Sequence, residues 1–161
     1  MNQRPQKPRI TDSTLDHLRV PPHSIEAEQS ILGGLLLDNQ AWDRMGDMLT
    51  DADFYRDEHR RIFRQIRNLL ERAKPADVVT VAEALDVAGE GEQTGGLAYL
   101  GELAANTPSA ANIKRYAEIV RERSVLRKLV ATADEIASDA LNPLGRDAET
   151  LLDEAESKIF K

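Results

Sequence analysis

The side chains best suited to metal binding or nucleophilic catalysis are scattered along this sequence of 161 residues. The histidines, His17, His23 and His59, show no metal-ligand spacing such as H-E-x-x-H, and there is no cysteine. Ser30 and Ser124 fall within helical patterns that place no general base near them. We therefore expect neither a catalytic residue nor a metal site in this chain.

Nucleotide binding is not expected either. The sequence contains neither of the phosphate-binding patterns G-x-x-x-x-G-K-[ST] and G-x-G-x-x-G. Its glycine-rich stretch, residues 89–96, carries Glu90 and Glu92 but no lysine or arginine, so it would repel a phosphate group. The prediction is that this chain binds no cofactor.

Charge is segregated along the chain. Residues 56–74 hold seven basic and three acidic side chains, whereas residues 134–156 hold eight acidic side chains and a single arginine. The two regions could dock one copy against another, or they could be ordinary solvated faces. The arginine-rich region is also the candidate for direct DNA contact. It lacks interleaved aromatics on which bases could stack, and a net charge of −7 favours protein partners over nucleic acid.

Composition favours an all-α protein in the cytoplasm. Hydrophobic residues make up 41% of the chain and aromatic residues only 4%, so the core must be mostly aliphatic, which suits helix-on-helix packing. No apolar run approaches the ~18 residues needed to cross a bilayer, and no secretory signal is present. Residues 1–22 are polar and contain four of the seven prolines, which predicts a flexible tail.

A compact helical head is predicted over residues 24–106. Ser24 is a suitable N-cap for a helix over 25–37, and the pair Gly33–Gly34 inside its apolar stripe indicates that another backbone approaches closely. Further helices are predicted over residues 40–49, with Trp42, Met45 and Met48 inward, and over 58–72, 78–87 and 97–105.

Some of these boundaries rest on single residues. Asp57 and Asp77 are expected to cap the helices that follow them. The β-branched run 78–81 could form a strand, but no strand partner is evident elsewhere, which favours a helix. In the helix over 97–105, Leu97, Leu100 and Leu103 are expected to be buried, with Tyr99 at the edge of that face.

A long helical hairpin is predicted over residues 108–161. Thr107 and Pro108 indicate the start of a helix of about 30 residues, which no breaker interrupts before Asn142-Pro143. Asp147 can cap a second helix, antiparallel to the first. The apolar stripe of the hairpin is expected to pack on the head or on another copy. Its residues are Leu126, Leu129, Ala133, Ile136, Ala140, Leu151, Leu152, Ala155 and Ile159.

Five stretches together resemble the amino-terminal domain of DnaB-type bacterial replicative DNA helicases. The first is VPPHSIEAEQSILGGL at residues 20–35, and the second is DFY at 53–55 followed by HRRIF at 59–63. The third is GGLAYLGEL at 95–103, and the fourth is NTPSAANI at 106–113 with IVRER at 119–123. The last is LLDEAE at 151–156. In order and spacing they cover residues 20–161.

The resemblance implies an assembly and primase-recruitment domain. In the family the hairpins form dimers, three dimers form the collar of a hexameric ring, and the collar binds the carboxy-terminal domain of primase. The positions that match the primase-facing surface are Glu26, Tyr99, Val130 and Ile136. Each has a plain structural alternative, such as helix-dipole complementation by Glu26 or hairpin packing by Val130 and Ile136.

The resemblance also implies parts that lie outside this chain. The family's RecA-like motor, which uses ATP and Mg²⁺ and carries most contacts with single-stranded DNA, would follow residue 161, so we expect the chain to be part of a longer protein. A helicase loader could also dock on the domain. Two alternative functions stay open: a free-standing helical DNA-binding module, and a phage or plasmid replication adaptor that never had a motor.

Overall fold

A computed structural model describes residues 20–160, so most of the predicted tail lies outside the described residues. Within that range it contains helices and no strand, which confirms the all-α prediction. The α-helices are α2 (Ile25–Leu37), α3 (Trp42–Met45), α4 (Asp57–Glu71), α5 (Val78–Val87), α6 (Gly96–Asn106), α7 (Ile113–Leu141) and α8 (Ala148–Ile159). Two 3₁₀ turns, η1 (Asn39–Ala41) and η2 (Asp51–Asp53), precede α3 and α4.

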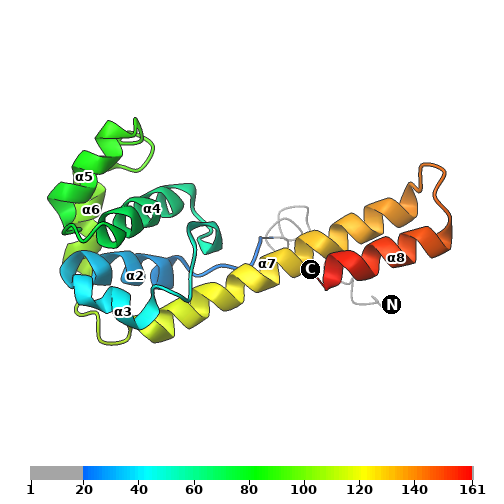
Figure 1. Cartoon of the computed structure of the whole chain (residues 1–161), viewed down its shortest axis with the longest axis horizontal. Coiled ribbons are helices and arrows are strands. Elements are labelled where there is room, and N and C mark those ends of the chain that lie inside the picture. The colour runs from blue at the N-terminus through cyan, green and yellow to red at the C-terminus, as the bar shows by residue number, and fades with distance from the viewer. Residues whose placement is uncertain (1–19, 161) are drawn as a thin grey trace, which may run out of the picture.

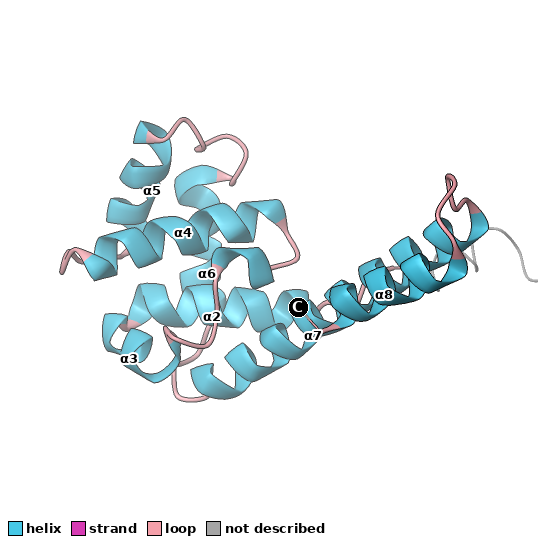
Figure 2. Ribbon diagram, turned by 45° about the vertical axis from the view of Figure 1, so that its right-hand side comes forward, coloured by secondary structure: helices cyan, strands magenta, loops and turns pink. Residues whose placement is uncertain are grey.

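Helix α2 is the centre of the head. It packs against α4, α6 and the first turns of α7, and α5 covers α4 and α6 from the far side (Figures 1 and 2). The core is almost entirely aliphatic, as the composition predicted, with Phe54 and Phe63 as its large aromatic members. It also includes Ile113, Ala117 and Val120 of α7, so the start of the long helix belongs to the packed head.

The glycine pair of α2 permits a close helix contact. A Cβ atom on Gly33 would overlap the Thr107 hydroxyl and the Leu103 backbone carbonyl, which lie at the end of α6. On Gly34 it would meet only side-chain and Cα atoms of Ile113 and Ala110, at 3.3 Å or more. The expectation that another backbone approaches this pair is therefore confirmed, and Gly33 is the residue that requires it.

Three predicted N-caps are confirmed. The side chains of Ser24, Asp77 and Asp147 accept hydrogen bonds from backbone N–H groups three residues later, at the starts of α2, α5 and α8. The stretch 78–81 is helical, as we expected from the absence of a strand partner.

Other boundaries differ from the prediction. Asp57 is the first residue of α4 and accepts from Arg61 instead of capping the helix. Thr107 does not cap α7, because its buried hydroxyl donates to the Leu103 carbonyl and closes α6. Helix α7 therefore begins at Ile113 and not at Pro108.

Two smaller corrections concern the middle of the head. The segment predicted as a helix over 40–49 is a 3₁₀ turn followed by the one-turn helix α3, which ends before Gly46, a residue that weakens helices. Met45 is buried, and Trp42 and Met48 pack partly buried against the core. Leu97 was expected to be buried, but it lies in the first turn of α6 and is 56% exposed.

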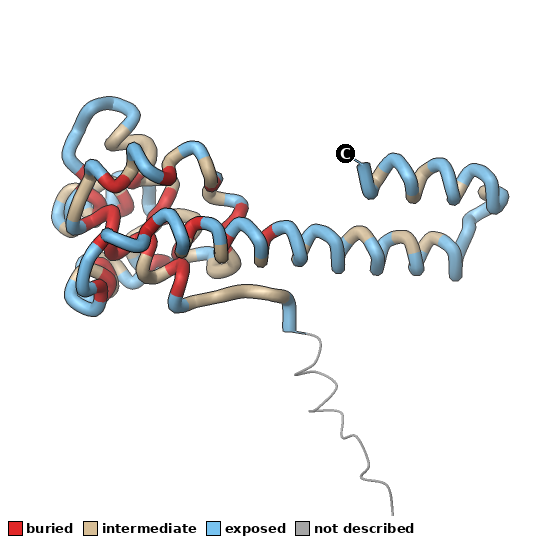
Figure 3. Tube along the Cα trace, turned by 90° about the horizontal axis from the view of Figure 1, so that it is seen from below, coloured by how far each residue is buried: buried red, intermediate tan, exposed pale blue. Residues whose placement is uncertain are grey.

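The hairpin projects away from the head. Beyond Ser124 no residue of α7 is buried, and none of α8 is (Figure 3). The two helices run side by side, joined by the predicted turn after Leu141, in which Leu144 and Gly145 have positive φ. Among the described residues, no helix is long and apolar enough to cross a membrane.

Candidate partner-binding site

A polar groove of about 230 Å³ lies between α2 and α6. It brings together Glu26 and Tyr99, two of the four positions that resemble the primase-facing surface. The remaining lining residues are Gln29, Ser30, Glu102, Leu103, Asn106 and Thr107. Glu102 and Asn106, which the sequence analysis did not single out, lie one and two turns after Tyr99 on α6, and this helical spacing could have indicated them.

The groove is acidic. Glu26 and Glu102 are both exposed, neither takes part in an ion pair among the described residues, and no lysine or arginine is among the lining residues. Two free carboxylates beside an aromatic ring favour a partner that presents basic side chains.

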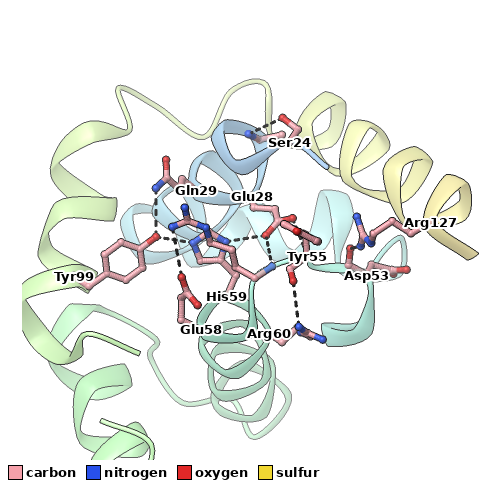
Figure 4. A network of polar contacts seen from close by, with 12 residues as sticks. Ser24, Glu28, Gln29, Asp53, Tyr55, Glu58, His59, Arg60, Tyr99 and Arg127 are labelled. Carbon is pink, nitrogen blue, oxygen red and sulfur yellow. Dashed lines mark hydrogen bonds and ion pairs between the residues drawn. The ribbon is translucent and has the colours of Figure 1, made fainter. Parts of the chain in front are cut away.

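Tyr99 is fixed in the groove by its hydroxyl group. The ring is partly exposed, whereas the hydroxyl points inward to His59 Nε2 at 2.6 Å and accepts from Gln29 Nε2 at 3.3 Å (Figure 4). His59 is fully buried, and its Nδ1 lies 2.8 Å from the buried carboxylate of Glu28. Tyr99 thus packs partly buried against the core, and its hydroxyl is bonded inside the head.

The other two resemblance positions lie apart from this groove. Val130 is 48% exposed on the projecting part of α7, and Ile136, six residues further along the same helix, is half-buried. This projecting part of α7 lies away from α6 within one chain (Figure 1). A single partner surface made from all four residues would need more than one copy of the chain.

A second, apolar groove runs between the two helices of the hairpin. It has a volume of about 410 Å³, and its lining includes five residues of the predicted apolar stripe: Ile136, Ala140, Leu151, Leu152 and Ala155. Leu126, Leu129, Ala133 and Ile159 lie outside it, and Leu129 and Ile159 are more than half exposed. The stripe therefore does not pack on the head, which was one of the two places expected for it.

The arginine-rich face of α4 is largely neutralised within the chain. Arg64 and Arg67 pair with Asp51, and Arg61 pairs with Asp57 and Glu90. These pairs reduce the positive charge that α4 could offer to DNA phosphates, which supports the interpretation of α4 as an ordinary charged face.

A buried carboxylate fastens the head to α7. Asp53 accepts from Ser124 Oγ at 2.7 Å and from Arg121 Nη1 at 2.8 Å. Arg127, which lies beside Asp53 in Figure 4, donates to the Asp53 backbone carbonyl. Burial alone would raise the pKa of Asp53, but hydrogen bonds from the Thr50 backbone, Ser124 and Arg121 outweigh it and leave the pKa below its ordinary value.

The two histidines that the structure describes, His23 and His59, have different surroundings. His17 lies outside the described residues, His23 stacks on Tyr55 with ring centroids 4.3 Å apart, and His59 is bound to Glu28. Among residues 20–160, no cluster of acidic or histidine side chains has a metal-binding arrangement.

The elements and grooves together define an all-helical domain with a projecting hairpin. The sequence profile of the DnaB-like helicase N terminal domain matches residues 20–122. The chain therefore belongs to this family.

Individual relatives agree with the assignment. The chain is 43% identical over 150 residues to the replicative DNA helicase DnaB of Haemophilus influenzae, and 44% identical over 143 residues to that of Geobacillus stearothermophilus. These matches cover 93% and 89% of this chain but only 32% and 31% of the relatives. The chain thus spans about a third of the length of the helicases that it matches.

Solved structures show the same fold. The N-terminal domain of DnaB helicase from Mycobacterium tuberculosis aligns with a TM-score of 0.84 and 38% identity, covering 88% of this chain and 99% of that structure. A DnaB-like replicative helicase, solved in a study of its interactions with primase, aligns with a TM-score of 0.64 and 27% identity over 84% of this chain and 31% of that protein.

Proposed function

We propose that this chain is the assembly and primase-recruitment domain of a replicative DNA helicase. The whole protein would unwind duplex DNA in the cytoplasm with ATP and Mg²⁺ bound to a motor domain, while this domain itself binds neither. Membership of the DnaB family supports the assignment to a replicative helicase. The two grooves support separate sites for primase binding and for assembly within the domain.

The observation that carries recruitment is the groove between α2 and α6. Glu26 and Tyr99 are 73 positions apart in sequence, yet they line the same groove. A partly exposed tyrosine offers a large contact area and has few rotatable bonds to immobilise, which favours it as an interface anchor. The acidic lining would select a basic element on primase.

Assembly is supported by the hairpin. Beyond Ser124 the two helices bury no residue, so this part of the hairpin has too little core to be held by packing within one chain. Its apolar groove and the exposed Leu129 and Leu152 would be covered in a dimer made through the hairpins, and three dimers would complete a ring. The neutralised face of α4 and the net charge of −7 weigh against the alternative of a free-standing DNA-binding module.

Substitution of Tyr99 by alanine tests recruitment. We expect Tyr99→Ala to weaken binding of the cognate primase carboxy-terminal domain by at least ~1–2 kcal/mol, the range for interface aromatics. Calorimetric titration of the parent and the variant measures this difference, and light scattering should show the same oligomeric state for both. If the binding isotherms of the parent and the variant superimpose, Tyr99 does not contribute to primase binding.

A further inference from the structure

A chain of hydrogen bonds runs from the core of the head to the floor of the groove. It begins at Glu28 on α2, passes through His59 on α4 and ends at Tyr99 on α6 (Figure 4). Glu28 and His59 are almost completely inaccessible, whereas the Tyr99 ring reaches the surface. The buried residues Glu28 and His59 are thus linked by hydrogen bonds to Tyr99, which a partner could contact.

The direction of each hydrogen bond follows from the chemistry of the groups. The Glu28 carboxylate can only accept, and it already accepts from the backbone N–H groups of Tyr55 at 2.8 Å and Arg56 at 3.4 Å. His59 Nδ1 therefore donates to Glu28, and in the neutral imidazole Nε2 is left as an acceptor. The Tyr99 hydroxyl accepts from the Gln29 amide, and with a neutral His59 it donates to Nε2.

This arrangement limits how Tyr99 can lie. Its hydroxyl is held from two helices, α2 and α4, and its ring lies nearly parallel to the His59 ring, with an interplanar angle of 8°. Rotation of the tyrosine out of the groove would leave the buried His59 Nε2 without a hydrogen-bond partner, which is unfavourable.

We propose that His59, itself held by Glu28, is a positioning residue for partner binding, because it fixes the Tyr99 ring in the binding groove. The inference rests on the proposed function, since it needs Tyr99 to be part of the primase contact. Preorganising an anchor side chain raises affinity because less freedom is lost when the partner binds.

Two replacements of His59 separate its two hydrogen bonds. The amide nitrogen of asparagine occupies nearly the position of Nδ1, so His59→Asn can still donate to Glu28 but cannot reach Tyr99. Glutamine is longer by one methylene group, so His59→Gln can place its amide near Nε2 and bond to Tyr99. A third variant, Tyr99→Phe, keeps the ring and removes the hydroxyl.

The test is titration of each variant with the cognate primase carboxy-terminal domain, at a temperature where circular dichroism shows it to be folded. His59→Asn and Tyr99→Phe should each weaken binding roughly three- to tenfold, as expected for the loss of one hydrogen bond. His59→Gln should stay within about twofold of the parent, since it keeps the bond to Tyr99. In a Tyr99→Ala background, His59→Asn should cause no further loss, because its effect acts through the tyrosine.

The outcomes separate this inference from the proposed function. If the parent does not bind the primase domain, both are wrong. If Tyr99→Ala weakens binding while Tyr99→Phe and His59→Asn bind like the parent, the recruitment site stands and the positioning role is refuted. Should His59→Asn fail to fold, Tyr99→Phe alone decides the question, since it leaves Glu28 and His59 in place.

Discussion

Substitution of Gly33 by alanine tests the close contact on which the head depends. The added methyl group would overlap the Leu103 carbonyl and the Thr107 hydroxyl, which are themselves joined by a hydrogen bond. Overpacking costs about 1–3 kcal/mol, and we expect the upper end because a backbone carbonyl cannot rotate away. Alanine regains about 1 kcal/mol of helix propensity. The net loss expected is therefore about 2 kcal/mol, from the difference between these two values.

Gly34→Ala is the matched control, one residue further along the same helix. Its Cβ atom would meet Ile113 Cδ1 at 3.3 Å and Ala110 Cβ at 3.4 Å, contacts that small side-chain shifts can relieve. The gain in helix propensity should then balance or exceed the packing cost, so stability should be unchanged or higher by up to about 1 kcal/mol.

Urea unfolding followed by circular dichroism, at one fixed protein concentration, measures the free energy of unfolding of the parent and of both variants. A loss of about 2 kcal/mol for Gly33→Ala corresponds to a drop in Tm of roughly 4–8 °C for a chain of this size. If Gly33→Ala proves as stable as Gly34→Ala, the close approach of α2 and α6 does not exist as described.

Two further predictions concern the free energy of unfolding at low pH and the binding of nucleotide. Because the pKa of Asp53 is lowered in the folded protein, its contribution is present above the unfolded-state value of 3.8 and is lost as pH falls through the lower folded value. Asp53→Asn should therefore cost about 1–3 kcal/mol at pH 7, and urea unfolding should show the difference from the parent shrinking below about pH 4. A difference that is independent of pH would mean that the ionised carboxylate is not what fastens α7. Calorimetry with ATP and Mg²⁺ at physiological salt should show no saturable binding, because the sequence has no phosphate-binding loop and its glycine-rich stretch is acidic.

The sequence predicted those features that depend on neighbouring residues. Ser24, Asp77 and Asp147 bond to N–H groups within their own helices, so a local pattern was enough to find them. Thr107 misled the prediction because its hydroxyl is used at the end of α6, and nothing in the local pattern distinguishes that role from a cap at the start of α7.

The buried polar pair was missed because its members are 31 residues apart. A signal was nevertheless present. Glu28 precedes Ile31 and Leu32 by three and four positions, and His59 stands in the same relation to Ile62 and Phe63, so both lie on the apolar faces of their helices. A charged or polar residue on an apolar face indicates a buried partner. Asp53 gives no such signal, and its bonds to Arg121 and Ser124 could be found only in the folded chain.

The mass of the protein in solution tests most directly whether the hairpin is an assembly element. Leu129 is 57% exposed on α7, so Leu129→Asp costs a single chain little, whereas in a dimer it would place an unpaired charge against apolar surface at a cost of several kcal/mol. Size exclusion coupled to light scattering should give a dimer or larger assembly for the parent and a single chain for the variant, with equal helical signal in circular dichroism. A variant that keeps the mass of the parent would show that this face of the hairpin does not hold the assembly together.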